Sequence, residues 1–495
     1  MFIKKEKMES SSKKKPTLGF SLLVILVLCV FVYLGVGPLN LNIALLLFLS
    51  WIVIAPFAAY LGYSFHDLEG FAYDMAKSAL PPAAIIMSVG IMIATWLAGG
   101  TVPTVLVVGL KLITPKLFLL VTFVLCSLVS ILMGTSWGTA GTAGVAMMGV
   151  GLSMGMSPGI VAGAVISGAY FGDKMSPMSD STNICATVTK TDLMTHIKYM
   201  SISSIPAFII SAILYTIVGM VKGGTNYDPS QVDSIITNLN AVFKIDFISV
   251  IPIILVLAML FMKKSVVVSL LVGAISAGVI AVVHQGFPIA SVGTFMMNGF
   301  KIETEDAILR SLLNRGGMTS MLTLVATFIG ALGLGGMMNK TGLIQPLLDA
   351  LTRRVRSGKS LIITTMVLTW ILVTVIATNN FAFAMLGTLL PSLFRKYNLK
   401  SENLSRALED CGTLGNVLVP WSVGAMFMTG TLGVTSSLDY LPWAFQNYIT
   451  PLVTIVMVLT GFRIAKVDPT RDLSPLSDSE LALLAEETGE EGHGV

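Results

Sequence analysis

Two polar segments with the same residue pattern interrupt long apolar stretches of this sequence. The first copy reads Gly172-Asp173-Lys174-Met175-Ser176-Pro177-Met178-Ser179, and the second, about half a chain later, reads Gly415-Asn416-Val417-Leu418-Val419-Pro420-Trp421-Ser422. A proline removes a helix N–H group and clashes with the preceding turn. We therefore predict that each copy breaks a helix, at Gly172 and Pro177 in the first copy and at Gly415 and Pro420 in the second.

Oxygen-bearing side chains gather at both copies. They predict a site for a hard cation such as Na⁺, which prefers oxygen ligands as the hard divalent ions do. The candidate neutral ligands are Ser179, Ser181, Thr182, Asn183, Thr135 and Ser136 in the first half, and Thr378, Asn379, Asn416 and Ser422 in the second. Asp173 and Asp180 add negative charge. Glu409 and Asp410 precede the second copy and are candidate proton carriers.

A carboxylate at such a site can bind either of two cations. Ionising it alone in a low-dielectric environment is costly. Bound Na⁺ favours the carboxylate, whereas departing Na⁺ favours the protonated acid, and this competition is the minimal chemistry of an antiporter. Asn416 stands at the position of Asp173 in the second copy and cannot titrate. The pattern thus predicts one ionisable copy and one neutral copy.

Composition indicates the class of protein in which these segments lie. The chain is 54% hydrophobic and only 12% charged, whereas soluble domains carry about 25% charged residues. No Asp, Glu, Lys or Arg occurs between Lys116 and Asp173, a stretch longer than the roughly 20 apolar residues that cross a bilayer. We predict an all-α polytopic protein of the cell membrane with about eleven to thirteen membrane segments.

Charge placement predicts the topology. Residues 1–17 contain a cluster of lysines that is expected to stay in the cytoplasm. Residues 18–466 form the transmembrane domain, and residues 467–495 an acidic cytoplasmic tail. This distribution explains the net charge of +4 better than a nucleic-acid partner does. The four cysteines, which lie in or beside apolar stretches, are expected to be unpaired.

A second matched pair extends the repeat. At the same offset as the polar copies, Gly134-Thr135-Ser136-Trp137-Gly138 faces Ala377-Thr378-Asn379-Asn380-Phe381. Interrupted segments at corresponding positions of two halves point to the binding site of a transporter. We predict a first repeat at about 80–222 and a second at about 318–463.

Several of these residues also fit simpler roles. Asp173 and Lys174 can form a neutralised structural pair, and Asp180 can cap a helix N-terminus. Glu409 and Asp410 follow other charged residues, which is typical of an exposed loop or helix start. The hydroxyls near Ser136 can bond to backbone carbonyls within a packed helix.

One pattern is typical of an enzyme. Gly134 to Gly138 matches the G-x-S-x-G motif of serine hydrolases, whose nucleophile needs a base. Of the four histidines, His66, His196, His284 and His493, only His196 lies near a motif. The matched copy has Asn379 in place of the serine, so we predict no enzymatic activity and no cofactor.

The twelve-residue run from Gly172 to Asn183 resembles the signature of the NhaC family of Na⁺/H⁺ antiporters, which also includes sodium-linked malate–lactate exchangers. The resemblance covers roughly Leu18 to Lys466. It implies two inverted repeats with re-entrant hairpins and Pro/Gly-broken helices, a scaffold that is often dimeric, and an elevator-type transport domain. The leading ion-site residues that it implies are Asp173, Ser179, Asp180, Thr182 and Asn183, with Na⁺ held at Asp173, Asp180 and Asn183.

This sequence departs from a symmetric pattern at two positions. Val417 and Val423 stand where the first copy has Lys174 and Asp180, which fits a single asymmetric site. We expect exchange of Na⁺ for H⁺ as the transported ions. The alternative is Na⁺- or H⁺-coupled exchange of a small organic anion such as malate or lactate, for which Lys174, Arg315 and Lys340 are candidate carboxylate contacts.

Overall fold

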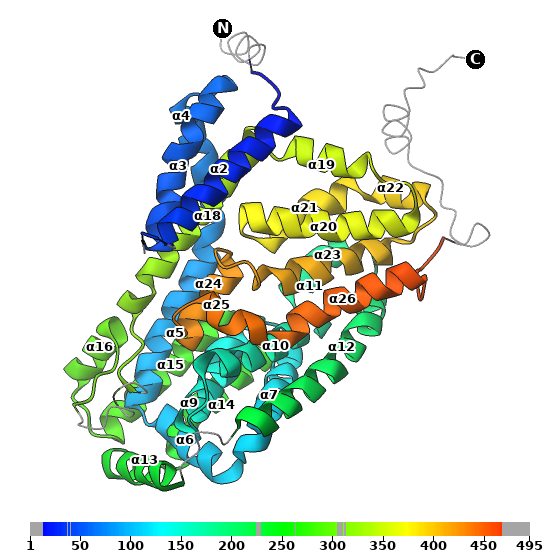
Figure 1. Cartoon of the computed structure of the whole chain (residues 1–495). Helices are drawn as coiled ribbons and strands as arrows, with labels where there is room; N and C mark the ends of the chain where they lie inside the picture. The colour runs from blue at the N-terminus through cyan, green and yellow to red at the C-terminus, as the bar shows by residue number, and fades with distance from the viewer. Residues whose placement is uncertain are drawn as a thin grey trace, which may run out of the picture.

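Helices build the part of the chain that the computed structural model describes, namely residues 13–467 apart from 37, 40, 224–228, 263, 304–309 and 311–312 (Figure 1). Most of the basic segment 1–17 and nearly all of the acidic tail 467–495 lie outside these residues. The one β pairing within the described part is an isolated antiparallel bridge between Leu399 and Lys466. All four cysteines are free. The predicted all-α class is confirmed.

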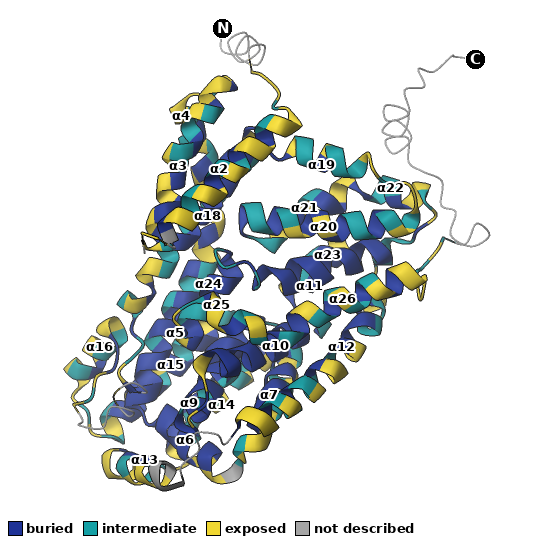
Figure 2. Cartoon of the chain, viewed as in Figure 1, coloured by how far each residue is buried: buried dark blue, intermediate teal, exposed yellow. Residues whose placement is uncertain are grey.

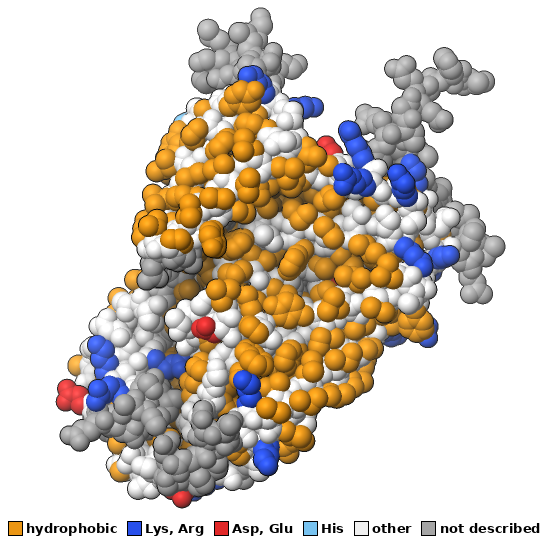
Figure 3. Space-filling view, in the orientation of Figure 1, with side chains coloured by type: hydrophobic (Ala, Val, Ile, Leu, Met, Phe, Trp, Pro, Cys, Tyr) orange, Lys and Arg blue, Asp and Glu red, His pale blue; other side chains and the backbone are white. Residues whose placement is uncertain are grey.

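The described residues include 8 helices that are long and apolar enough to cross a membrane, or up to 9 if the bent pair Ser437–Trp443 and Phe445–Thr460 is one span. The sequence predicts more membrane segments, eleven to thirteen. Its number is higher because it also includes helices that are too short or too polar to span a membrane alone. The face of the molecule that Figure 3 shows is largely hydrophobic. Only 22% of the window Leu18–Gly35 is buried by other protein, as expected for a helix that faces lipid.

One group of long helices forms a side of the molecule (Figure 1). Its members are α2 (Leu18–Val36), α3 (Ile43–Tyr60), α4 (Phe65–Ala76), α5 (Leu80–Ala98), α15 (Val266–Val283), α16 (Ile289–Asn298) and α18 (Leu322–Lys340). Helix α18 packs against α3 and α4, and α5 packs against α15. The indole Nε1 of Trp51 donates to the carbonyl of Gly330 at 2.9 Å, which joins α3 to α18. Small residues on α18 allow this close approach.

A second group carries the polar segments. Its members are α7 (Phe118–Met133), α10 (Pro158–Met175), α11 (Asp180–Val188), α12 (Leu193–Lys222), α20 (Gly358–Ile376), α21 (Asn379–Leu389), α22 (Pro391–Lys396), α23 (Ser401–Asn416), α24 (Val423–Leu432), α25 (Ser437–Tyr440) and α26 (Phe445–Thr460). Helix α7 lies along α10, α20 along α23, and α12 along α26. Figure 2 shows α10 and α23 as largely buried, so these two helices, which lead into the polar segments, lie inside protein rather than against lipid.

The remaining elements connect these two groups. They are α6 (Thr101–Leu112), α8 (Ser136–Thr139), the π-helical turn η3 (Ala140–Gly144), α9 (Val145–Ser153), α13 (Pro229–Val242), α14 (Ile251–Phe261) and α19 (Gln345–Thr352), with short 3-10 turns such as η5 (Met318–Met321). The order from α5 to α12 matches the order from α18 to α26. In each stretch a helix ends at a left-handed residue, a short helix follows, and a longer helix then breaks.

The two motif glycines are not at the breaks, contrary to the sequence prediction. Gly172 lies inside α10 and Gly415 inside α23. A Cβ atom at Gly172 would lie 2.5 Å from the Cβ of Ser130 on α7, so glycine is needed there for close helix packing. The breaks themselves contain Pro177 and Pro420, as predicted.

Candidate functional site

The first break runs from the end of α10 at Met175 to the start of α11 at Asp180. Side chains satisfy the backbone carbonyls that it frees. Thr182 Oγ1 donates to the carbonyl of Lys174 at 3.2 Å. Asn183 Nδ2 donates to the carbonyls of Pro177 at 3.0 Å and Ser179 at 2.7 Å. The donors of Thr182 and Asn183 therefore hold the break in shape.

At the second break, too, a side chain satisfies a backbone carbonyl that the break frees. Ser422 Oγ donates to the carbonyl of Asn416 at 2.5 Å and accepts from the backbone N–H of Ala425 at 3.0 Å. Ser422 is thus the N-cap of α24. The side chain of such a residue accepts from a backbone N–H group that has no partner within the helix. Its hydroxyl is already engaged on both sides.

The buried carboxylate of Asp173 is the centre of the first half of the site. It lies on α10 and accepts a hydrogen bond from Ser136 Oγ at 2.8 Å. Ser136 begins α8, directly after Thr135, whose Oγ1 accepts from the Gly138 N–H at 3.3 Å. Thr135 is therefore a cap, whereas Ser136 points its hydroxyl at the acid. The alternative of bonding to backbone carbonyls fails for Ser136, which donates to the acid, and Thr135 accepts from a backbone N–H instead.

The second half repeats this contact without charge. Asn416 Nδ2 donates to Asn379 Oδ1 at 3.2 Å, and these two residues occupy the positions of Asp173 and Ser136. Ala377 precedes them in a left-handed conformation with φ +63°, as Gly134 precedes Ser136 with φ +68°. Thr378 is the N-cap residue of α21, without a side-chain capping bond.

Two buried polar atoms beside this pair have no hydrogen-bond partner among the described residues. They are the Oη of Tyr170 and the Oδ1 of Asn416. A Cβ atom at Gly424, the second residue of α24, would lie 2.8 Å from Tyr170 Oη and 3.0 Å from Asn416 Nδ2. Both side chains therefore face the start of α24. The sequence prediction missed Tyr170, although its position three residues before Asp173 on one helix places it on the same face.

The other predicted ion ligands have a different environment. Asp180 is exposed at the first position of α11, where its charge suits the positive end of the helix dipole. Ser179 Oγ and Ser181 Oγ lie 3.1 Å apart. Ser179 also lies close to the Asp173 carboxylate. The structure thus brings Ser136, Ser179 and Asp173 together. Asp180 instead stays exposed, where the break ends and α11 begins.

An ion pair joins the two breaks. Lys174, next to Asp173, pairs with Asp410 on α23, and their side chains are 1% and 0% exposed. Asp410 also accepts hydrogen bonds from Thr454 and, at 3.4 Å, from Ser203. The partner of Lys174 is thus Asp410 rather than Asp173, and Asp410 lies in a buried helix rather than an exposed loop. A buried lysine needs such a partner.

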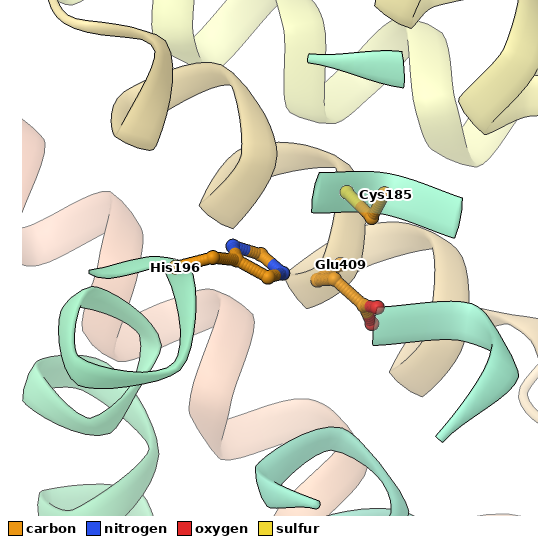
Figure 4. A group of neighbouring side chains, drawn as sticks. All are labelled: Cys185, His196 and Glu409. Carbon is orange, nitrogen blue, oxygen red and sulfur yellow. The ribbon is translucent and has the colours of Figure 1, made fainter. Parts of the chain in front are cut away.

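Glu409 is the second buried acid of α23, and neither of its oxygens has a hydrogen-bond partner among the described residues. It belongs to a group with Cys185 and His196, whose ligand atoms lie within 4.8 Å of one another (Figure 4). Thiolate, imidazole and carboxylate are donors that Zn²⁺ takes. The nearby positive charges of Lys174 and Arg406 disfavour a divalent cation, and we assign no metal to this group.

Comparison with known proteins identifies the family of this chain. Residues 168–462 match the model of the Na⁺/H⁺ antiporter family, a range that includes both breaks. The chain belongs to the Na⁺/H⁺ antiporter family. The antiporter is thus a membrane transporter, as the sequence predicts, and the resemblance to the NhaC family is confirmed.

Relatives match over most of their length. The antiporter is 38% identical to the malate-2H⁺/Na⁺-lactate antiporter of Bacillus subtilis (strain 168), with 88% of this chain and 94% of the relative covered. It is 36% identical to the Na⁺/H⁺ antiporter NhaC of Alkalihalophilus pseudofirmus, over 92% and 98%. It is 34% identical to NhaC of Bacillus subtilis (strain 168), over 83% and 91%.

Proposed function

We propose that this antiporter exchanges Na⁺ for H⁺ across the cell membrane, with the two cations competing for the carboxylate of Asp173. The observation that carries the proposal is the buried Asp173–Ser136 contact at the first break, beside the neutral Asn416–Asn379 contact at the second. In this position the carboxyl group is uncharged when it holds a proton, and its negative charge is balanced when it holds Na⁺. Either state avoids an isolated buried charge.

The ligand set for Na⁺ is centred on oxygens that the fold leaves available. Asp173, Ser136 and Ser179 form its first side, and the unpartnered oxygens of Tyr170 and Asn416 form the second. Asp180 and Asn183 stay in the proposed Na⁺ site and lie at its entrance, where the negative charge of Asp180 attracts the cation. Thr182 and Ser422 support the site by holding its backbone. Glu409 and Asp410 remain candidate proton carriers.

The test is Asp173→Asn in proteoliposomes that contain a pH-sensitive dye. Wild-type protein should move protons when Na⁺ alone is added. Asp173→Asn should abolish this movement because its amide cannot exchange a proton, and Asp180→Asn should weaken it. Asp233→Asn, on exposed α13, is the matched control and should transport normally. Full exchange by both Asp173→Asn and Asp180→Asn would remove these acids from the ion site and point to Glu409 or Asp410.

We also propose that the two stretches, 80–222 and 318–463, are inverted repeats. The matched order of elements and the matched left-handed residues Gly134 and Ala377 support this. So do the crosswise contacts, in which η3 of the first stretch touches α24 and α21 of the second touches α11. Next to the first of these contacts, the ring of Trp137 on α8 stacks on the ring of Phe427 on α24, with centroids 4.3 Å apart.

The proposed movement follows the resemblance. The group that carries the breaks would be the transport domain, and the group from α2 to α5 with α15 and α18 the scaffold, through which two copies pair as a homodimer. Basic residues before α2 and after α26 support cytoplasmic termini. Helix α24 touches both α18 and α5, so it lies where the two groups would slide past each other.

Exchange of a small organic acid is the second candidate. It is favoured by the 38% identity to the malate-2H⁺/Na⁺-lactate antiporter. The same liposomes separate the two candidates. Proton movement with Na⁺ alone supports the first, whereas movement that requires malate or lactate supports the second.

A further inference from the structure

A cavity of about 360 Å³ lies away from the two breaks, between the scaffold side and the end of α24. Ile93 of α5, Ser320 of η5 and the segment around Arg315 line one side, and Gly430 of α24 and its C-cap residue Gly433 line the other. This volume is at the lower end of the roughly 300–1,000 Å³ typical of small-molecule pockets. It suits a molecule of a few carbon atoms.

Arg315 is the side chain that gives this cavity its chemistry. It is half-buried, and none of the ion pairs among the described residues includes it. Among the described residues of the lining, the other cation is Lys301, which is exposed, and none is Asp or Glu. A partly desolvated cation without a counter-charge is costly, and an anion in the cavity would relieve that cost.

The backbone holds Arg315 firmly in place. Its carbonyl accepts from the Phe300 N–H at 3.1 Å, and the Gly317 N–H donates to the carbonyl of Gly90 on α5 at 2.7 Å. Gly316 and Gly317 have φ values of +84° and +85°, a region in which glycine is the residue without strain. The backbone from which the Arg315 side chain extends is therefore fixed next to the cavity, as a binding residue requires.

The polar neighbours of Arg315 are already engaged. Asn314 Oδ1 accepts from the Ile302 N–H at 2.7 Å, and Ser320 Oγ donates to the carbonyl of Gly317 at 2.7 Å. Arg315 thus presents the donors that remain, in the planar fork that matches a carboxylate at two points. A Cβ atom at Gly433 would lie 3.0 Å from Arg315 Nη2, so glycine keeps this face of the guanidinium open.

We propose that this cavity binds a small carboxylate anion, held at Arg315. The site rests on the second proposed function, exchange of an organic acid, and supplies the binding residue for it. A bound anion would touch α24, whose other end begins beside Asn416 and Tyr170. Helix α24 has ten residues, about 15 Å of helix, and links the anion cavity to the cation site.

The test is calorimetric titration of the purified protein with malate and with lactate. Wild-type protein should bind at least one of them, and Arg315→Gln should bind at least tenfold more weakly. Arg315→Lys should be intermediate, because it keeps the charge and loses the fork. Ile93→Phe, which reduces the cavity but keeps the arginine, should also weaken binding. Arg356→Gln, an exposed arginine outside the cavity, is the matched control and should bind normally.

Other outcomes would overturn the site. Equal binding by wild-type protein and Arg315→Gln, or chloride displacing the organic acid at equal concentration, would show that the cavity does not select carboxylates. If Arg315→Gln unfolds, normal binding by both Arg315→Lys and Ile93→Phe would leave Arg315 as a cap for the C-terminus of α24. Na⁺-driven proton movement without organic acid, measured on the same variants, reports separately on the cation exchange and does not depend on this site.

Discussion

Ser136 is the residue whose side chain contacts Asp173, the acid that we propose exchanges the two cations. Its hydroxyl donates to Asp173 at 2.8 Å, and its matched residue Asn379 contacts the neutral Asn416. One acid and one hydroxyl in the first half thus correspond to two amides in the second. This difference concentrates the proposed cation exchange on one of the two breaks.

Replacing Ser136 by alanine tests this contact. A hydrogen bond to a charged group contributes about 1.5–3 kcal/mol, so the Na⁺ concentration for half-maximal exchange should rise about tenfold or more. Ser127→Ala is the control, because that buried hydroxyl donates to a carbonyl of its own helix at 2.7 Å and should leave exchange unchanged. An unaltered Na⁺ dependence in Ser136→Ala would exclude the hydroxyl from the site.

Gly134 and Ala377 both have a left-handed backbone conformation. Replacing the glycine by alanine and the alanine by glycine should therefore change the stability of the protein in opposite directions. Gly134→Ala should destabilise, because φ is +68° and the new Cβ would lie 2.6 Å from that of Met178. Ala377→Gly should stabilise by up to about 1 kcal/mol, because it relieves a positive φ. Thermal unfolding in detergent measures both shifts. The same sign for both variants would contradict the matched geometry.

At the scale of elements, the ion pair between Lys174 and Asp410 connects α10 to α23. Each of these helices leads into one break, so the pair links the two helices that precede the breaks. Thr454 on α26 and Ser203 on α12 also bond to Asp410. Four helices are therefore joined through one carboxylate.

Replacing one member of this pair should destabilise the protein far more than replacing both members. Lys174→Met alone leaves a buried carboxylate unpaired and should destabilise by about 3–5 kcal/mol, whereas Lys174→Met with Asp410→Leu should recover most of the loss. The midpoint of thermal unfolding, compared across the two single variants and the double variant, measures the coupling. Lys198→Met, at an exposed position of α12, is the control. Additive losses would show that the two residues do not act as a pair.

For the whole molecule, α24 contacts α18 and α5, and this contact is the boundary between the group that carries the breaks and the group that we propose is the scaffold. The proposed elevator movement requires these surfaces to slide. The packing there involves Gly430 of α24 against Leu324 of α18, and glycine gives a smooth surface. The same boundary contains the Arg315 cavity, so an anion held there would bear on the movement.

Cross-linking across this boundary should stop transport. In a cysteine-free background, Leu324→Cys with Gly430→Cys, treated with a short thiol-specific cross-linker that reduction can cleave, should lose Na⁺-driven proton movement. Activity should return on reduction, which serves as the internal control, and each single variant should remain active under the same treatment. Full activity after complete cross-linking would contradict a sliding movement at α24.

The sequence by itself determined the class, the family and the positions of the breaks. Apolar runs must lie in lipid or in a core, and prolines cannot continue a helix, so these features are local and readable. It also singled out Asp173 and its neutral counterpart Asn416. Gly172 and Gly415 were misjudged, because whether a glycine breaks a helix or packs against another depends on a neighbour distant in sequence.

Only the tertiary structure decided which polar groups meet. It paired Lys174 with Asp410 rather than Asp173, assigned Thr182, Asn183 and Ser422 to backbone support, and left Asp180 exposed. It also placed Arg315 in a cavity whose described lining residues include no acid. The physical reason is that a hydrogen bond or ion pair depends on distances of a few ångströms between helices. Residue spacing along the chain determines such distances within one helix and not between two.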